Sequence, residues 1–144
     1  MSVNQISVFL ENKPGTLKKM TGFLAEHKID MRAISVSETV GFGVARLIVN
    51  DAMSAVNTLK ENDFIANLTP VLVVEVPDEA GGLDSLLQVF AESEINIEYM
   101  YAFSTGRDVS HAYMIFRVAD IKAAEAKLSG RGIRMLEQDD IVVL

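Results

Sequence analysis

The sequence reads Glu-Asn-Lys-Pro-Gly-Thr-Leu at residues 11–17 and Val-Pro-Asp-Glu-Ala-Gly-Gly-Leu at residues 76–83, and these two stretches decide the fold. Before the first stretch, apolar residues alternate with other residues, as in a strand that buries one face. After each stretch, apolar residues recur at helical spacing. A turn of this kind that occurs twice, with Gly15 aligned on Gly81, predicts that one structural unit repeats at an offset of 66 residues.

The alignment of the two copies extends outward from the turns over the rest of the chain. We expect one extra residue in the hairpin of copy two, which moves the offset to 67, and two more residues before the last helix. The apolar pairs that this alignment brings together include Leu17 with Leu83, Leu24 with Phe90, Leu47-Ile48 with Met114-Ile115, and Leu59 with Leu128.

Each copy predicts the element order β-α-β-β-α-β. Asp51 and Asp120 are expected to cap the second helix of each copy, because Asp is a favoured N-cap residue. Hairpin turns are expected at residues 41–43 and 105–108. The stretch 137–140 is expected to be a solvated loop before an apolar C-terminus. The expected elements are strands at 6–10, 31–38, 44–49 and 64–68 with helices at 17–24 and 51–59, then strands at 71–74, 97–103, 112–118 and 133–136 with helices at 83–90 and 120–128.

This element order predicts an α+β fold of two ferredoxin-like βαββαβ units in tandem, each with an antiparallel sheet and its helices on one face. The expected domains are residues 1–70 and 71–144. Two cores of this size are thin. Because each would gain from burying more surface, we expect a homodimer.

The composition narrows the classes of partner. The net charge is −7, and no run of Lys or Arg supplies the basic face that neutralises phosphates, so neither nucleic acid nor an anionic membrane is expected as a partner. The absence of Cys excludes thiolate nucleophiles and Cys-ligated metals. No signal segment and no apolar stretch of about 20 residues is present, so a cytoplasmic location is expected.

The repeat and the two loop motifs resemble the ACT domain, and the chain as a whole resembles a stand-alone protein of two tandem ACT domains. The resemblance implies a regulatory protein that binds an amino acid or similar small effector where two units meet. Ala80 departs from the family, which commonly has Pro there. The residues that the resemblance implicates are Glu11, Asn12, Lys13, Pro14, Gly15, Thr16 and Leu17 in the first loop, Asp78, Glu79, Ala80, Gly81, Gly82 and Leu83 in the second loop, and Ile34, Ser35, Met100 and Tyr101 in the second strands.

The chemistry of the loop agrees with that implication. A helix N-terminus leaves backbone N–H groups unpaired and carries positive potential, so it suits a carboxylate. Gly15 and Gly81 let the backbone approach a ligand. Asn12 or Asp78 could accept a hydrogen bond from an α-ammonium group, and Asp78 would add charge.

Plainer interpretations stand beside these. Gly15 and Gly81 could serve the turn alone, and Asn12 and Asp78 could cap helices. Tyr99, Tyr101 and Phe103 share one face of a strand and favour sheet packing over base stacking. His27 and His111 are expected to be surface or packing residues rather than catalysts or ligands.

The leading hypothesis is therefore a regulatory sensor that binds a free amino acid at ACT–ACT interfaces through these loops. No nucleotide-binding, paired-His or nucleophile-elbow motif is present, so no catalytic residue, cofactor or metal is expected. Two alternatives stay open: a small enzyme on a ferredoxin-like scaffold, and a scaffold that pairs with a partner protein without any ligand. A regulated enzyme partner is compatible with the leading hypothesis, although the sequence does not name one.

Overall fold

The computed structural model describes residues 2–103 and 111–144, so the expected turn at 105–108 lies outside the described residues. The chain forms two compact units: residues 4–69, and residues 70–144 together with the first residues up to Val3. Within the described ranges, no helix is long and apolar enough to cross a membrane.

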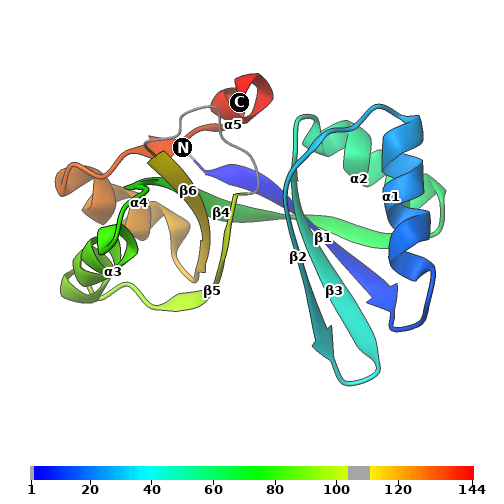
Figure 1. Cartoon of the computed structure of the whole chain (residues 1–144), viewed down its shortest axis with the longest axis horizontal. Helices are drawn as coiled ribbons and strands as arrows, with labels where there is room; N and C mark the ends of the chain where they lie inside the picture. Colours follow the sequence, from blue (N-terminus) through cyan, green and yellow to red (C-terminus); the bar gives the residue numbers. More distant parts are fainter. Residues whose placement is uncertain (1, 104–110) are drawn as a thin grey trace. The chain divides into compact units, whose positions relative to one another are not determined.

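The unit of residues 4–69 is a four-stranded sheet with two helices on one face (Figure 1). Its strands lie in the order β2-β3-β1-β4, and β3 runs antiparallel to both β1 and β2. Its elements are β1 (Val3–Glu11), α1 (Thr16–Glu26), β2 (Met31–Thr39), β3 (Phe42–Val49), α2 (Ala52–Glu61) and the first part of β4 (Ile65–Pro77).

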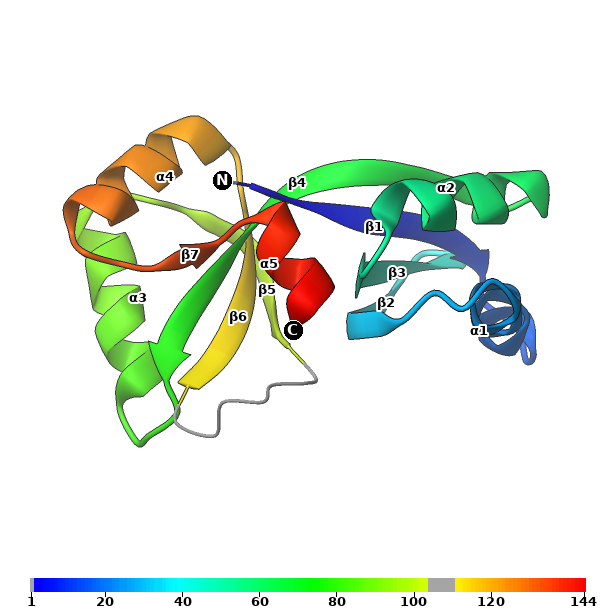
Figure 2. The ribbon, with the colours of Figure 1, turned by 90° about the horizontal axis from the view of Figure 1, so that it is seen from above.

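The unit of residues 70–144 repeats this arrangement with the strand order β5-β6-β4-β7. Helices α3 and α4 lie together on one face of its sheet, and the short helix α5 lies on the other face (Figure 2). The elements that follow β4 are α3 (Gly82–Glu92), β5 (Ile97–Ala102), β6 (His111–Val118), α4 (Ile121–Gly130), β7 (Met135–Leu136) and α5 (Gln138–Val143). The predicted fold class is confirmed.

Strand alternation explains where each core lies. Side chains alternate between the two faces of a strand, so every second residue of β1 points toward the helices. The core of the first unit contains Ile6, Val8, Leu10, Met20, Leu24, Leu47 and Leu59, and that of the second contains Leu72, Val74, Val76, Leu86, Phe90, Phe116 and Leu128. The remaining face of each sheet, which we call the open face, carries the other side chains of the strands.

The two copies share their backbone hydrogen bonds as well as their element order. The Ile29 N–H donates to the Leu24 carbonyl at 3.0 Å, and the Ile95 N–H donates to the Phe90 carbonyl at 2.9 Å. The residue before each donor, Lys28 or Glu94, has a φ of 56°. Since these positions are 66 residues apart, the offset inferred from the loops holds through the whole first helix.

Strand register corrects the alignment of the third strands. Ile34 pairs with Leu47, whereas Met100, 66 residues after Ile34, pairs with Phe116. Leu47 therefore corresponds to Phe116 rather than to Met114, and the offset is already 69 in β6. The error of two residues leaves every side chain on its correct face, so an apolar pattern cannot reveal it.

The helix starts at Asp51 and Asp120 are confirmed. Each carboxylate accepts a hydrogen bond at 3.1 Å from the backbone N–H three residues later, Ser54 in one copy and Ala123 in the other. Such a bond satisfies one of the N–H groups that a helix start leaves unpaired.

The C-terminal stretch differs from the expectation. Strand β7 has only two residues, and residues 137–140 are not a solvated loop but the start of helix α5. The Asp140 carboxylate accepts a hydrogen bond from the Glu137 N–H at 2.7 Å. Acidic residues are favourable in the first turn of a helix because they oppose its dipole. Ile141 of this helix is fully buried.

The close approach of Gly82 to the chain before it gives a test of this packing. A Cβ built on Gly82 would lie 2.2 Å from the Pro77 carbonyl oxygen, whereas one on Gly130 would meet no atom within 4 Å. We expect Gly82→Ala to lower the free energy of unfolding by about 1 to 3 kcal/mol. The matched change Gly130→Ala is expected to be neutral or to stabilise by up to about 1 kcal/mol. Urea unfolding of both variants measures this, and equal effects would contradict the close approach.

Candidate functional site

The loop between β1 and α1 is a hydrogen-bonded turn that ends at a left-handed glycine. The Lys13 N–H donates to the Glu11 carbonyl at 2.9 Å, and Gly15 follows with a φ of 90°. Gly15 is the N-cap of α1, and no side chain caps the helix. The first-turn N–H groups of α1 therefore face the loop without a side-chain acceptor at the cap position.

The loop between β4 and α3 has the same backbone. The Glu79 N–H donates to the Pro77 carbonyl at 2.9 Å, and Gly81 is the N-cap of α3 with a φ of 85°. The left-handed conformation shows that both glycines do serve the turn, since few other residues adopt it.

Asn12 and Asp78 do not cap the helices. The N-caps are glycines, and the Asn12 side-chain amide instead donates to the Glu38 carboxylate at 3.0 Å. This bond ties the first loop to the end of β2. Asp78 is exposed at the equivalent place in the second loop.

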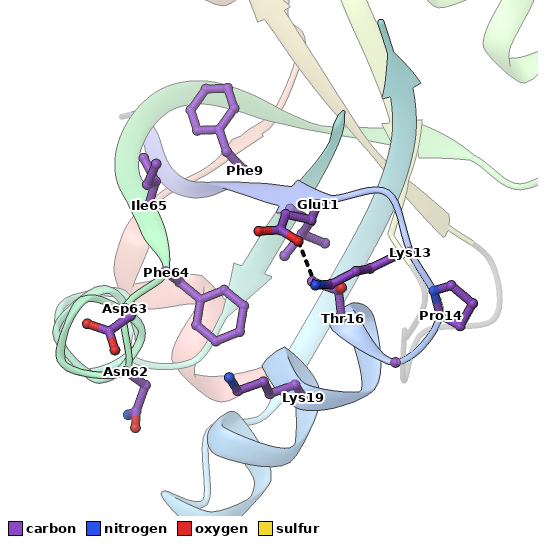
Figure 3. Close-up of a pocket in the computed structure, with 12 residues that line it drawn as sticks. Phe9, Glu11, Lys13, Pro14, Thr16, Lys19, Asn62, Asp63, Phe64 and Ile65 are labelled. Atoms are coloured by element: carbon purple, nitrogen blue, oxygen red, sulfur yellow. Dashed lines mark ion pairs between the residues drawn. The ribbon is translucent and has the colours of Figure 1, made fainter. Parts of the chain in front are cut away.

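A cavity of about 490 Å³ lies beside the first loop. The loop and the start of α1 form one side, and the turn between α2 and β4 forms the other (Figure 3). Its volume falls within the range of about 300–1,000 Å³ that is usual for small-molecule sites. The residues that line it are Phe9, Leu10, Glu11, Lys13, Pro14, Gly15, Thr16, Lys19, Asn62, Asp63, Phe64 and Ile65.

Four charged side chains line this cavity: two form an ion pair with each other, and two do not. Lys13 Nζ lies 2.8 Å from Glu11 Oε2, and the hydrogen bond and charge of Lys13 lower the pKa of Glu11 while those of Glu11 raise the pKa of Lys13. Lys19 and Asp63 form no ion pair with any described residue. The lining therefore includes one cation, Lys19, and one carboxylate, Asp63, that are not engaged in these ion pairs; in Figure 3 the Asp63 carboxylate is directed away from the loop.

The apolar part of the cavity comes from the two strands that end or begin there. Phe9 and Leu10 belong to β1, Ile65 begins β4, and Phe64 precedes it. The ring of Phe64 packs edge-on against Phe23 with centroids 6.1 Å apart. The Phe64 N–H donates to the Leu59 carbonyl at 3.0 Å, which fixes the turn after α2.

Five of the residues that the sequence implicated in the first copy line the cavity: Glu11, Lys13, Pro14, Gly15 and Thr16. Leu17 is exposed on the first turn of α1 and lies outside the lining. Ile34 and Ser35 are consecutive in β2, so their side chains point to opposite faces. Neither of them lines the cavity.

In the second copy the implicated residues do not form one group. Asp78, Glu79, Ala80, Gly81 and Leu83 are exposed, whereas Gly82 is buried. Met100 packs against the core beneath the helices. Tyr101 stacks on Tyr99 of the same strand with ring centroids 6.5 Å apart.

Sequence reasoning missed the residues that the turn after α2 contributes, Asn62, Asp63, Phe64 and Ile65. This turn carries no motif and lies about 50 residues after the first loop. The predicted topology held the only signal, because a split β-α-β unit places the last strand beside the first. The end of β1 and the start of β4 then meet at one edge of the sheet.

The histidine and acidic side chains of the described residues do not meet the requirements of a metal site. No group of three or more His, Asp or Glu side chains among the described residues is placed to hold a metal ion. His27 bonds the Phe23 carbonyl through Nδ1 at 2.9 Å, at the end of α1. His111 Nε2 lies 3.3 Å from a carboxylate oxygen of Glu75.

Comparisons with known proteins bear on the family and the fold. The sequence profile of the ACT domain pair matches residues 1–144. A protein from Bacteroides thetaiotaomicron of known crystal structure is 32% identical, with 100% of this chain and 98% of that chain covered and a TM-score of 0.91. No curated protein matches the sequence.

More distant structures share the fold. The regulatory subunit of aspartate kinase from Thermus thermophilus, in a ligand-free form, is 20% identical over 91% of this chain and 92% of that chain, with a TM-score of 0.66. The same subunit from Thermus flavus is 19% identical over 88% and 90%, with a TM-score of 0.57.

The Glu11–Lys13 pair gives a test of the cavity's electrostatics. In an NMR titration, the pKa of Glu11 is expected below its ordinary value of 4.5, and Lys13→Met is expected to raise it again. Because the folded-state pKa is lowered, the pair stabilises the fold fully above pH 4.5 and loses this effect as the pH falls through the lowered pKa.

Glu92 is the internal control for this titration. Hydrogen bonds from Gln88 and Arg131, and the charge of Arg131, lower the pKa of Glu92 in the other copy. Lys13→Met should leave that pKa unchanged. An unchanged pKa of Glu11 in the same variant would show that the pair does not persist in solution.

Proposed function

We propose that this chain, which belongs to the ACT domain pair family, is a regulatory protein that binds a free amino acid in the cavity beside the β1–α1 loop. One observation carries the proposal. The same cavity combines a helix N-terminus without a side-chain cap, a cation and a carboxylate that pair with no residue in the described part of the chain, and an apolar wall. An amino acid with an α-carboxylate, an α-ammonium group and a side chain would complement these features.

The α-carboxylate of the ligand would lie at the start of α1. The first-turn N–H groups and the helix dipole favour an anion there. Lys19 projects from the second turn of the same helix into the cavity lining, and its ammonium group adds a charge-assisted bond. Gly15 presents no side chain at the point where the carboxylate would approach.

The α-ammonium group would pair with Asp63, whose exposed carboxylate would turn from its position in Figure 3 toward the loop. Glu11 is the other carboxylate of the lining, but it is already engaged with Lys13 at 2.8 Å. Asp63 has a φ of 67°, a left-handed conformation that costs an L-residue free energy, although Asp tolerates it better than most. The corresponding residue of copy two is Gly132, which adopts a φ of 75° without that cost. An Asp at this position supports a use for its side chain.

The wider parts of the proposal rest on the family. The Thermus proteins that share the fold are regulatory subunits of an enzyme, which supports a non-catalytic, regulatory role. We further propose that residues 1–70 and 71–144 are the two domains, that the protein is a cytoplasmic homodimer, and that a partner chain completes the site. Ile34 and Ser35, or Met100 and Tyr101, would then contribute from a neighbouring unit.

Calorimetry of the full chain with each of the twenty amino acids tests the proposal, with Lys19→Met as the diagnostic variant. A hydrogen bond to a charged group is worth about 1.5 to 3 kcal/mol, so the change should weaken binding by about tenfold or more. Lys18→Met is the matched control, because Lys18 is the neighbouring exposed lysine and does not line the cavity. Its affinity should stay within about twofold of the wild type.

Two results would contradict this function. Binding of no amino acid would favour a scaffold without a ligand, one of the alternatives that the sequence left open. Equal loss of affinity in both lysine variants would mean that the amino acid binds away from the cavity. Thermal unfolding without ligand should be the same for both variants, since each lysine is exposed.

A further inference from the structure

Three exposed apolar residues of copy one occupy the same positions as three polar residues of copy two. Phe42 pairs with Glu11 across the strands, as His111 pairs with Pro77, so the offsets of 66 and 69 hold on the open face. We call Phe9, Phe42 and Ile65 the apolar trio. Their equivalents, Glu75, His111 and Arg134, form the polar trio.

The apolar trio is unusually exposed for large apolar side chains. Phe9, Phe42 and Ile65 have exposed fractions of 39%, 40% and 69%. The rings of Phe9 and Phe42 lie 5.9 Å apart between centroids, so they form one surface. Phe9 and Ile65 also line the cavity of copy one. The apolar surface is thus continuous with the charged groups that would hold an amino acid.

The side chains of the polar trio contact one another. Glu75 Oε2 lies 2.9 Å from Arg134 Nη1, and Glu75 Oε1 lies 3.3 Å from His111 Nε2. The Glu75 side chain is only 15% exposed, and both of its oxygens are engaged. At the equivalent place in copy two, the apolar side chain of a ligand would therefore find no apolar surface to pack against.

The loop of copy two also lacks the groups for a carboxylate. Glu79 stands where copy one has Lys13, and Ser85 stands where it has Lys19. Gly82 replaces Thr16 and packs so tightly on the Pro77 carbonyl that no Cβ fits between them. Where copy one has Lys13 and Lys19, copy two therefore has the negative charge of Glu79 and a loop with no room for a side chain at Gly82.

We propose, on the basis of the function proposed above, that the effector is an amino acid with an apolar side chain and that each chain binds one molecule, in copy one alone. The ligand's polar ends lie against Lys19 and Asp63, and its side chain covers Phe9 and Ile65. The apolar trio is then the specificity surface of the site. It is matched to an apolar ligand because burying apolar surface is favourable and burying an unpaired polar group is not.

The test is calorimetry of the full chain with an apolar series, Val, Leu, Ile, Met and Phe, and a comparison series, Gly, Asp and Lys. We expect at least one apolar amino acid to bind at least about tenfold more tightly than glycine, because the shared polar ends are the same and only the side-chain contact differs. The expected stoichiometry is one ligand per chain. A preference for Asp or Lys, or two ligands per chain, would overturn the inference.

The double variant Phe9→Glu with Ile65→Arg transplants the charged pair of copy two into copy one. It should abolish the preference for apolar amino acids, while Met53→Arg, a change of an exposed apolar residue on α2 outside the cavity, should keep it. Arg134→Met should leave both affinity and stoichiometry unchanged, because copy two does not bind. Far-ultraviolet circular dichroism establishes that each variant is folded.

The failure of this inference differs from the failure of the function it rests on. If no amino acid binds the wild type, both are overturned. If amino acids bind but the double variant keeps its ligand preference, only the inference falls. If that variant instead changes the sedimentation of the protein without changing affinity, the apolar trio is a contact between chains and not a ligand surface.

Discussion

The left-handed backbone at Gly15 and Gly81 constrains everything that follows each loop. It turns a strand into a helix within a few residues and without a side-chain cap. The first N–H group of each helix donates to the loop backbone, and the N–H groups that follow it have no side-chain acceptor at the cap. Few residues other than glycine adopt this conformation at low cost. The same constraint that reverses the chain therefore also creates the anion-binding end of the helix, and the cavity of copy one lies beside it.

The two copies show how one backbone can carry different chemistry. Their loops and helix ends share the same hydrogen bonds residue for residue, because these bonds depend on backbone geometry rather than on side-chain type. The side chains that the backbone presents have diverged in charge, from Lys13 and Lys19 to Glu79 and Ser85, and from Phe9 and Ile65 to Glu75 and Arg134. The two copies share their backbone, and they differ in the side chains that line the loops.

The sequence predicted features that depend on local interactions. The glycine turns, the Asp51 and Asp120 caps and the strand and helix periods were visible, and the fold class followed from their order. The alignment of β3 with β6 was wrong by two residues, because a shift of two residues keeps every side chain on the same face of the sheet. Helix α5 was missed because six residues are too few to show a helical period. Seven of the twelve lining residues were missed. Residues 62–65 were missed because only tertiary structure brings them to the first loop, and Phe9, Leu10 and Lys19 because they lie outside the loop motif.

The backbone of Asp63 separates a structural requirement from a functional one. In both copies the turn after the second helix needs a left-handed residue, since the next N–H donates to the Leu59 or Leu128 carbonyl in the same way. Gly132 meets that requirement at little cost, whereas Asp63 meets it at some cost and adds a carboxylate to the cavity. Lys28 and Glu94 are also left-handed, but they occur in both copies and so mark no difference. The contrast at Asp63 coincides with the cavity, which is why we place the ammonium partner there.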